Sequence, residues 1–171
     1  MLIGTGTVLR PWECEDLQLL QQLRNNVTLQ TQLMAKPKGS SLDQVRNWLS
    51  HKSNDPNTIF LVIADRETNN ALGYIQVVDM SWVGGYCRLG ICLAPTAQGR
   101  GYAYEAINLL EHYLITVFKM RKFLLEVLES NKRAVRLYLR CGFREVGKLL
   151  LHYPIGDIYE NVIVMEKILV A

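Results

Sequence analysis

The stretch APTAQGRGYAYEAI, from Ala94 to Ile107, places two glycines and an arginine at the start of what reads as a long helix. Glycine is unfavourable inside a helix and proline is worse. Such residues just before a helix indicate a loop whose backbone must approach something that a side chain would obstruct. The apolar run from Tyr86 to Leu93 precedes this loop and is typical of a strand. The loop therefore joins a strand to a helix.

The loop itself, QGRGYA, has two possible interpretations. The first turn of a helix carries unpaired N–H groups and the positive end of the helix dipole, and glycines let a phosphate come close to them. The loop is therefore either a diphosphate cradle or a tight strand-to-helix turn. No Gly-Lys-Ser/Thr follows, and there is no third glycine in a βαβ unit. These absences exclude the nucleotide P-loop and the dinucleotide fingerprint, leaving a diphosphate held by backbone N–H groups without a metal.

Composition indicates one globular domain over residues 1–171, since 49% of the residues are hydrophobic and 20% are charged. The net charge of +3 is scattered, which favours a small anionic ligand over nucleic acid. No apolar run reaches the roughly 18 residues of a membrane span, and the start does not resemble a signal peptide. We therefore expect a cytoplasmic protein without membrane contact. Cys14, Cys87, Cys92 and Cys141 fit no metal pattern, so we expect reduced thiols and no bound metal.

Hydrophobic spacing and turn residues predict the order of the elements. Expected strands cover 7–12, 58–64, 72–78, 86–93, 122–130, 143–153 and 158–169, and expected helices cover 13–26, a segment capped by Ser41 and Gln44, 102–118 and 131–141. Gly142 is suited to end the last helix in a left-handed conformation. Two of the strand pairs read as hairpins. The prediction is an α+β fold with a mixed, mostly antiparallel sheet and about four helices.

Two motifs at fixed positions resemble the GNAT N-acetyltransferases. The first is Q/R-x-x-G-x-G/A, matched by Gln98, Gly101 and Ala103. The second is N-x-x-A-x-x-x-Y-x-x-x-G-F, matched by Asn131, Ala134, Tyr138, Gly142 and Phe143. The resemblance covers nearly the whole chain. Within the family, the chain resembles the branch that contains the ribosomal-protein-alanine, spermidine and amino-sugar acetyltransferases.

This resemblance implies acetyl-CoA as co-substrate and splayed central strands that receive its pantetheine arm. Backbone groups of Ile91, Cys92 and Leu93 would pair with the arm. The residues implied to hold the pyrophosphate are consecutive: Gln98, Gly99, Arg100, Gly101, Tyr102 and Ala103. Arg100 is at a variable position, where contact with a phosphate or with solvent is equally expected. Asn131 would cap its helix, contact the arm, or do both. Tyr138 would protonate the departing thiolate.

The implied reaction is direct attack of a neutral amine on the thioester, without an acyl-enzyme. Cys92 is therefore expected to be a structural thiol. The general base is open, because Arg88 stands where the family often has Glu. Asp79, Glu126 and His152 are the candidates.

The acceptor that the resemblance favours is a small molecule: an amino sugar, an amino acid, a polyamine or an aminoglycoside. The alternatives are a protein N-terminus, or a non-enzymatic module that only binds acyl-CoA or a protein partner. Trp82 and the segment from Val27 to Gly39 are either walls of the acceptor site or plain surface loops. The chain is expected to be a monomer or a homodimer.

Overall fold

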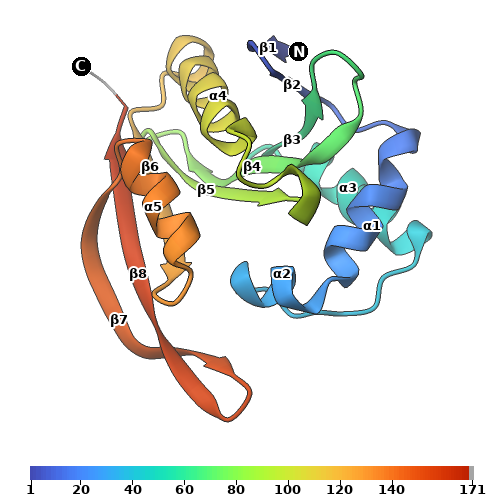
Figure 1. The fold of residues 1–171 in the computed structure, drawn as a ribbon. Helices are drawn as coiled ribbons and strands as arrows, with labels where there is room; N and C mark the ends of the chain where they lie inside the picture. Colours follow the sequence, from blue (N-terminus) through green and yellow to red (C-terminus); the bar gives the residue numbers. More distant parts are fainter. Residues whose placement is uncertain (170–171) are drawn as a thin grey trace.

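The computed structural model describes residues 1–169, which form one open sheet with helices on both faces (Figure 1). The strands run in the order β1-β2-β3-β4-β5-β6-β8-β7, and all neighbours are antiparallel except β5 and β6. The strands are β1 Leu2–Ile3, β2 Thr7–Arg10, β3 Ile59–Asp65, β4 Ala71–Ser81, β5 Tyr86–Leu93, β6 Lys122–Leu128, β7 Arg144–Ile155 and β8 Ile158–Ile168. The α-helices are α1 Leu17–Asn25, α2 Val27–Gln32, α3 Leu42–Asn54, α4 Tyr102–Phe118 and α5 Lys132–Arg140.

The predicted α+β fold and order of elements are confirmed, with two additions. The described residues contain five α-helices rather than about four, because α2 forms where a loop was expected. Asn26 caps α2 by accepting a hydrogen bond from the N–H of Leu29 at 3.0 Å. The short strand β1 was also missed. Neither segment is long enough to show a hydrophobic period. No helix within residues 1–169 has the length and apolar character needed to cross a membrane.

The sheet separates two hydrophobic cores. One face is covered by α4 and α5, whose apolar residues pack with those of β4, β5 and β6. The other face is covered by α1, α2 and α3, and its core includes Trp48, Phe60, Tyr74 and Cys92. Side chains alternate along β5, so Leu93 belongs to the first core and Cys92 to the second.

The strands β5 and β6 diverge in the middle of the sheet, as the resemblance implied. They pair only from Tyr86 opposite Lys122 to Arg88 opposite Leu124. Beyond Arg88, β5 continues paired with β4 alone, and β6 continues paired with β8 alone. This leaves one edge of β5 without a strand partner, so its backbone groups there are available to a ligand.

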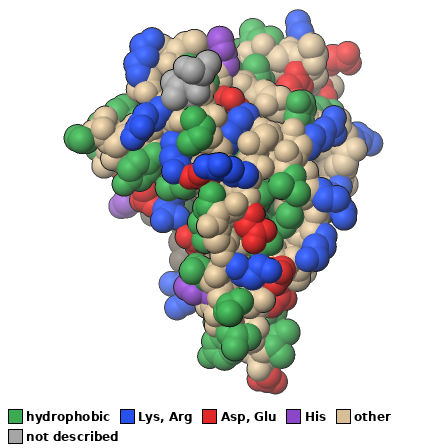
Figure 2. All heavy atoms as spheres, turned by 90° about the vertical axis from the view of Figure 1, so that its left-hand side faces the viewer, with side chains coloured by type: hydrophobic (Ala, Val, Ile, Leu, Met, Phe, Trp, Pro, Cys, Tyr) green, Lys and Arg blue, Asp and Glu red, His purple; other side chains and the backbone are tan. Residues whose placement is uncertain are grey.

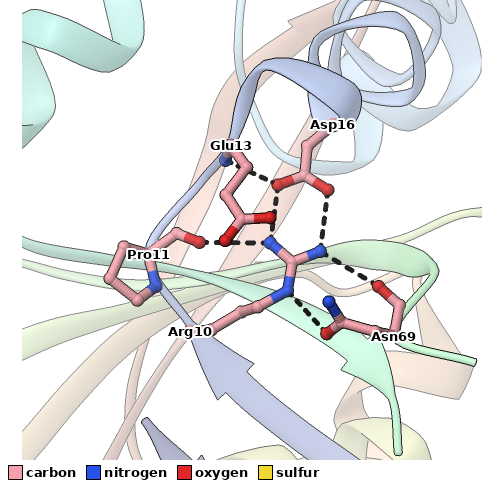
Figure 3. Close-up of polar contacts among 5 residues, drawn as sticks. All are labelled: Arg10, Pro11, Glu13, Asp16 and Asn69. Atoms are coloured by element: carbon pink, nitrogen blue, oxygen red, sulfur yellow. Dashed lines mark hydrogen bonds and ion pairs between the residues drawn. The ribbon is translucent and has the colours of Figure 1, made fainter. Parts of the chain in front are cut away.

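Arg10 forms a network of hydrogen bonds near the N-terminus (Figure 3). Its guanidinium donates to both carboxylate oxygens of Asp16 at 2.7 and 2.9 Å, and to Asn69 and the carbonyl of Pro11. All five N–H donors of the guanidinium are thereby used. The two charged side chains are 4% and 3% exposed. The pair joins the end of β2 to the start of α1 and to the turn between β3 and β4.

The strands β7 and β8 form a long hairpin that projects from the body of the molecule (Figure 1). Apolar side chains gather at its far end, which is the narrow lower end in Figure 2. The exposed ones include Leu149, Leu150, Leu151, Ile158 and Tyr159. No other part of the described chain covers this apolar surface.

Candidate active site

A pocket of about 430 Å³ opens where β5 and β6 part. Its walls come from β5, β6, the start of α4, one side of α5 and the end of α2. The predicted site residues that line it are Ile91, Cys92, Leu93, Gln98, Gly99, Gly101, Tyr102, Ala103, Asn131 and Tyr138. Arg100 is not among the lining residues, although it lies within the same loop. The two sequence motifs therefore meet at one cavity.

The glycine loop has the backbone conformation that its sequence predicts. Gly99 and Gly101 have φ angles of 80° and 90°, a region that L side chains rarely adopt. A Cβ added at Gly101 would meet no atom within 4 Å, so it would enter open space in a residue that lines the pocket. Within the described chain no side chain caps α4. Its first-turn N–H groups are thus suited to an anion.

Two side chains of the loop have structural partners. Gln98 donates from Nε2 to the carbonyl of Leu93 at 3.1 Å and accepts from Arg133 Nη1 at 2.7 Å. The Tyr102 hydroxyl donates to Asp65 Oδ2 at 2.9 Å, at the end of β3. These contacts fix the loop to β5, α5 and β3. What remains available to a ligand at these two positions is the backbone.

The arginines of α5 were not singled out from the sequence. Arg133, Arg136 and Arg140 all line the pocket. Their spacing of three and four residues places them on one side of the helix, which was the available signal. The Arg140 guanidinium also lies 4.6 Å from the centre of the Tyr104 ring. This side of the pocket is positively charged and suits a ligand with several phosphates.

Asn131 begins α5 and lines the pocket. Its Oδ1 accepts a hydrogen bond from the N–H of Ala134 at 3.2 Å, so the helix cap predicted at Asn131 is confirmed. The cap fixes the direction of α5, and with it the position of Tyr138 two turns further on.

Tyr138 is buried, with 7% of its surface exposed, and its ring packs against Phe143 with the ring centres 5.6 Å apart. It lines the pocket. Burial, followed by the neighbouring thiols of Cys141 and Cys92, raises the pKa of Tyr138 above the ordinary value for tyrosine. The hydroxyl therefore stays protonated throughout the neutral range and can donate a proton but not accept one as a phenolate.

Cys92 also lies at the pocket, and burial raises the pKa of its thiol to about 12. A thiol is a nucleophile only as the thiolate, which is scarce at neutral pH with this pKa. Its environment thus agrees with the expected structural role and disfavours an acyl-cysteine.

The three candidate bases differ in their positions relative to the pocket. Glu126 lines the pocket, and its Oε1 accepts from Arg88 Nη1 at 2.9 Å. Asp79 lies on the outer side of Arg88, 3.6 Å from its Nε, and is 73% exposed. His152 is exposed on β7 and does not line the pocket. Of the three, only Glu126 is placed to reach a bound ligand.

The two expected acceptor walls also differ. Trp82 hydrogen-bonds to Asn57 Oδ1 at 2.9 Å, is 52% exposed, and does not line the pocket. The segment from Val27 to Gly39 does contribute, through Leu29, Gln32 and Leu33 of α2 and its end. The segment is therefore a wall of the pocket, whereas Trp82 belongs to the surface.

A parted sheet with a glycine-capped helix beside the gap defines a cofactor-dependent transferase fold. The chain matches the acetyltransferase (GNAT) domain family over residues 7–144, and it belongs to this family. It is an acetyl-CoA-dependent N-acetyltransferase, which confirms the expectation from the two motifs.

The relatives include enzymes that act on small amines. The chain is 29% identical to the spermidine N(1)-acetyltransferase of Vibrio cholerae over 160 residues, 94% of this chain and 91% of that enzyme. It is also 29% identical to the phosphinothricin N-acetyltransferase of Streptomyces coelicolor, over 84% of this chain and 86% of that enzyme.

The solved structures agree with this fold. The crystal structure of the V. cholerae spermidine N-acetyltransferase with CoA and spermine superimposes with a TM-score of 0.88 at 27% identity, over 96% of each chain.

Proposed function

We propose that this enzyme transfers the acetyl group directly from acetyl-CoA to a primary amine of a small molecule. The observation that carries the proposal is the neutral, buried Tyr138 at the pocket between the parted strands. The amine attacks the thioester carbonyl, a tetrahedral intermediate forms, and the C–S bond breaks. Tyr138 gives its proton to the departing thiolate.

The cofactor would bind along one side of the pocket. The pantetheine amides would pair with the free edge of β5 at Ile91, Cys92 and Leu93. The pyrophosphate would lie on the loop from Gln98 to Ala103, with Arg133 and Arg136 supplying positive charge from α5. Asn131 would contact the arm through the part of its amide that does not cap the helix.

The proton of the attacking amine would leave toward Glu126, directly or through a water molecule. Glu126 is the carboxylate that lines the pocket, and Arg88 orients it. Because alkyl amines are mostly protonated at neutral pH, the rate should rise between roughly pH 6 and 9. Tyr138 should not cause a decline over this range, because its pKa is raised.

A small-molecule acceptor is favoured over a protein N-terminus by the relatives, which include acetyltransferases of spermidine and of phosphinothricin. We further propose a cytoplasmic location and a reaction that needs no metal. Within the described residues no group of three potential metal ligands gathers. Unchanged activity after treatment with a chelator is the expected result.

The test is a screen of primary amines with acetyl-CoA in which released thiol is measured. Acetyl-CoA at about 100 times its dissociation constant should stabilise the fold by about 2.7 kcal/mol, a shift of several degrees in Tm. NAD and ATP serve as controls and should cause little shift. No shift with acetyl-CoA would contradict the proposed cofactor site.

We also propose that the chain self-associates through the exposed apolar end of the β7–β8 hairpin. The V. cholerae relative has been described as dodecameric in one solved structure, with a TM-score of 0.81 at 26% identity. Leu150 is 72% exposed on this hairpin, a typical position for a residue that a second copy covers. Light scattering should give a mass above that of one chain, reduced in Leu150→Glu.

A further inference from the structure

The pocket reaches both faces of the sheet through the gap between β5 and β6. Leu93 and Tyr138 line it and belong to the core under α4 and α5. Leu29 and Cys92 also line it, but they belong to the core on the opposite face, under α1, α2 and α3. The groups proposed to hold the cofactor phosphates lie on α5 and at the start of α4. The side that the cofactor leaves free for the amine is therefore the α2 side.

The α2 side of the pocket is apolar and carries no acid. Leu29 on α2 and Leu33, which ends this helix, both line the pocket, and Gln32 is the polar side chain between them. On β5, Gly90 lines the pocket without a side chain, which leaves room for a ligand. Residues 17–42, which form α1, α2 and the following loop, contain no Asp or Glu. This wall suits an alkyl or aromatic body.

One carboxylate lines the pocket in the part of the chain that the structure describes, and it already has a cationic partner. It is Glu126 on β6, whose Oε1 accepts a hydrogen bond from Arg88 Nη1 at 2.9 Å. Asp79 lies on the other side of Arg88 and does not line the pocket. Under the proposed function Glu126 takes the proton of the reacting amine. No carboxylate of the described pocket is then left for a second ammonium group.

A polyamine would bring at least one further ammonium group into this pocket. Taking an ammonium group out of water is strongly unfavourable unless a carboxylate receives it. An uncharged alkyl or aromatic body is instead stabilised by burial against the leucines of the α2 side. The charge of the pocket thus disfavours a polycation, although spermidine N(1)-acetyltransferases are among the relatives.

We propose that the acceptor is a primary monoamine with an uncharged, apolar body, and that the acid-free α2 side of the pocket excludes polyamines. The proposal rests on the proposed small-amine acetyltransferase activity. Gln32 is the position that sets this specificity, because it is exposed, lines the pocket, and differs from a carboxylate only in its amide group. A carboxylate at this position would supply the partner that a second ammonium group lacks.

The experiment compares a straight-chain monoamine with the diamine and the ω-amino carboxylate of equal chain length, and with spermidine. Turnover with acetyl-CoA is followed by released thiol, and binding to the enzyme–CoA complex is measured by calorimetry. We expect kcat/KM for the monoamine to exceed that for the diamine by about tenfold or more. Equal or better use of the diamine, of spermidine or of the amino carboxylate overturns the inference.

Turnover and binding test different claims. If acetyl-CoA binds but no amine is acetylated, the proposed activity is wrong. Tighter calorimetric binding of the monoamine than of the diamine would still support the charge preference, and the reverse order would overturn it.

Gln32→Glu should raise the ratio of kcat/KM for the diamine to that for the monoamine by about tenfold. Because Gln32 is exposed, the Tm should hardly change. Gln18→Glu on α1 is the matched control, since it makes the same change of charge at an exposed residue that does not line the pocket. A ratio that stays constant in Gln32→Glu, or that rises equally in both variants, overturns the role of the α2 side.

Discussion

The two sides of the pocket are built in different ways. The side proposed for the cofactor, called the cofactor side below, comes from two continuous stretches, 91–103 and 131–140, and it offers a free strand edge, positive-φ glycines and arginines in one row. The side proposed for the acceptor comes from α2 and β6, and it offers individual side chains brought from distant parts of the sequence. A ligand held by backbone groups leaves a fixed motif in the sequence, whereas a ligand held by scattered side chains does not.

The sides also differ in how their charges are arranged. On the cofactor side three arginines line the pocket. On the acceptor side the one carboxylate among the lining residues, Glu126, is paired with Arg88. The first arrangement suits a ligand with several phosphates.

The largest effect should come from Gly101→Val, which tests whether the cofactor side acts through its backbone. The side chain would enter the space proposed for the pyrophosphate, and we expect acetyl-CoA to bind about 100-fold more weakly through the loss of two charge-assisted hydrogen bonds. Calorimetry measures the affinity. A valine at φ 90° should also cost about 1–2 kcal/mol of stability.

Gly142→Val is the matched control for that strain. Gly142 has φ 87° but does not line the pocket. Both variants should lose similar stability, whereas only Gly101→Val should lose acetyl-CoA binding. If the two variants bind acetyl-CoA equally well, the pyrophosphate does not lie on the Gln98–Ala103 loop. The contrast between a backbone-built cofactor side and a side-chain-built acceptor side would then be wrong.

A smaller effect is expected from Tyr138→Phe, at the point where the two sides meet. The change removes one oxygen and keeps the packing of the ring on Phe143. We expect kcat to fall at least about tenfold, since a positioned acid typically contributes about 10²–10⁴-fold and water can replace it in part. The Tm and the affinity for acetyl-CoA should hardly change. An unchanged kcat with a good acceptor would exclude Tyr138 as the acid.

The cofactor side could be predicted from the sequence because its parts have fixed spacing. Gly99, Gly101, Asn131 and Tyr138 all meet at the pocket that their motifs indicated. The parted strands followed from the resemblance, since the run of apolar residues in β5 alone does not reveal a missing neighbour. The arginines of α5 were missed because the sequence does not say which side of an amphipathic helix faces a cavity.

The acceptor side could not be predicted to the same extent. The segment VTLQTQ of α2 is short and has three β-branched residues, which weaken any helical signal. The candidate bases could not be separated from the sequence either, because it does not show which of Asp79, Glu126 and His152 lines the pocket.

Glu105→Gln should have a smaller effect, on stability. Glu105 supports the start of α4, the helix beside the proposed cofactor side. Glu105 in the first turn of α4 accepts hydrogen bonds from the hydroxyls of Thr5 and Thr7, both at 2.7 Å. Partial burial opposes ionisation, but these bonds prevail and lower the pKa of Glu105. A lowered pKa in the folded state means that the stabilisation is present above the unfolded pKa and is lost as pH falls through the folded one.

We therefore expect Glu105→Gln to lose about 1 kcal/mol, a few degrees in Tm, at pH 7. The difference from the unmodified enzyme should begin to shrink as pH falls below the ordinary pKa of a glutamate, and it should vanish once pH is below the lowered pKa of Glu105 in the folded state. Thermal melts from pH 3 to 7 measure this. A difference that stays constant with pH would mean that the shape of the side chain, and not its charge, anchors the N-terminal turn.

The smallest effect on catalysis should come from Cys92→Ala, a change at a residue that contributes to both sides. The backbone of Cys92 lies on the edge of β5 proposed to bind the cofactor, whereas its side chain packs in the acceptor-side core with Tyr74. Burial raises the pKa of the thiol to about 12, so almost no thiolate is present at pH 8. Direct transfer needs no nucleophilic thiol. We expect kcat to stay within about threefold while Tm falls modestly, by the roughly 1 kcal/mol that a small cavity costs. Stopped-flow measurement of thiol release should show no burst in either protein.

A loss of kcat of about 10³-fold in Cys92→Ala, or an acetylated Cys92 found by mass spectrometry, would show an acyl-enzyme and overturn direct transfer.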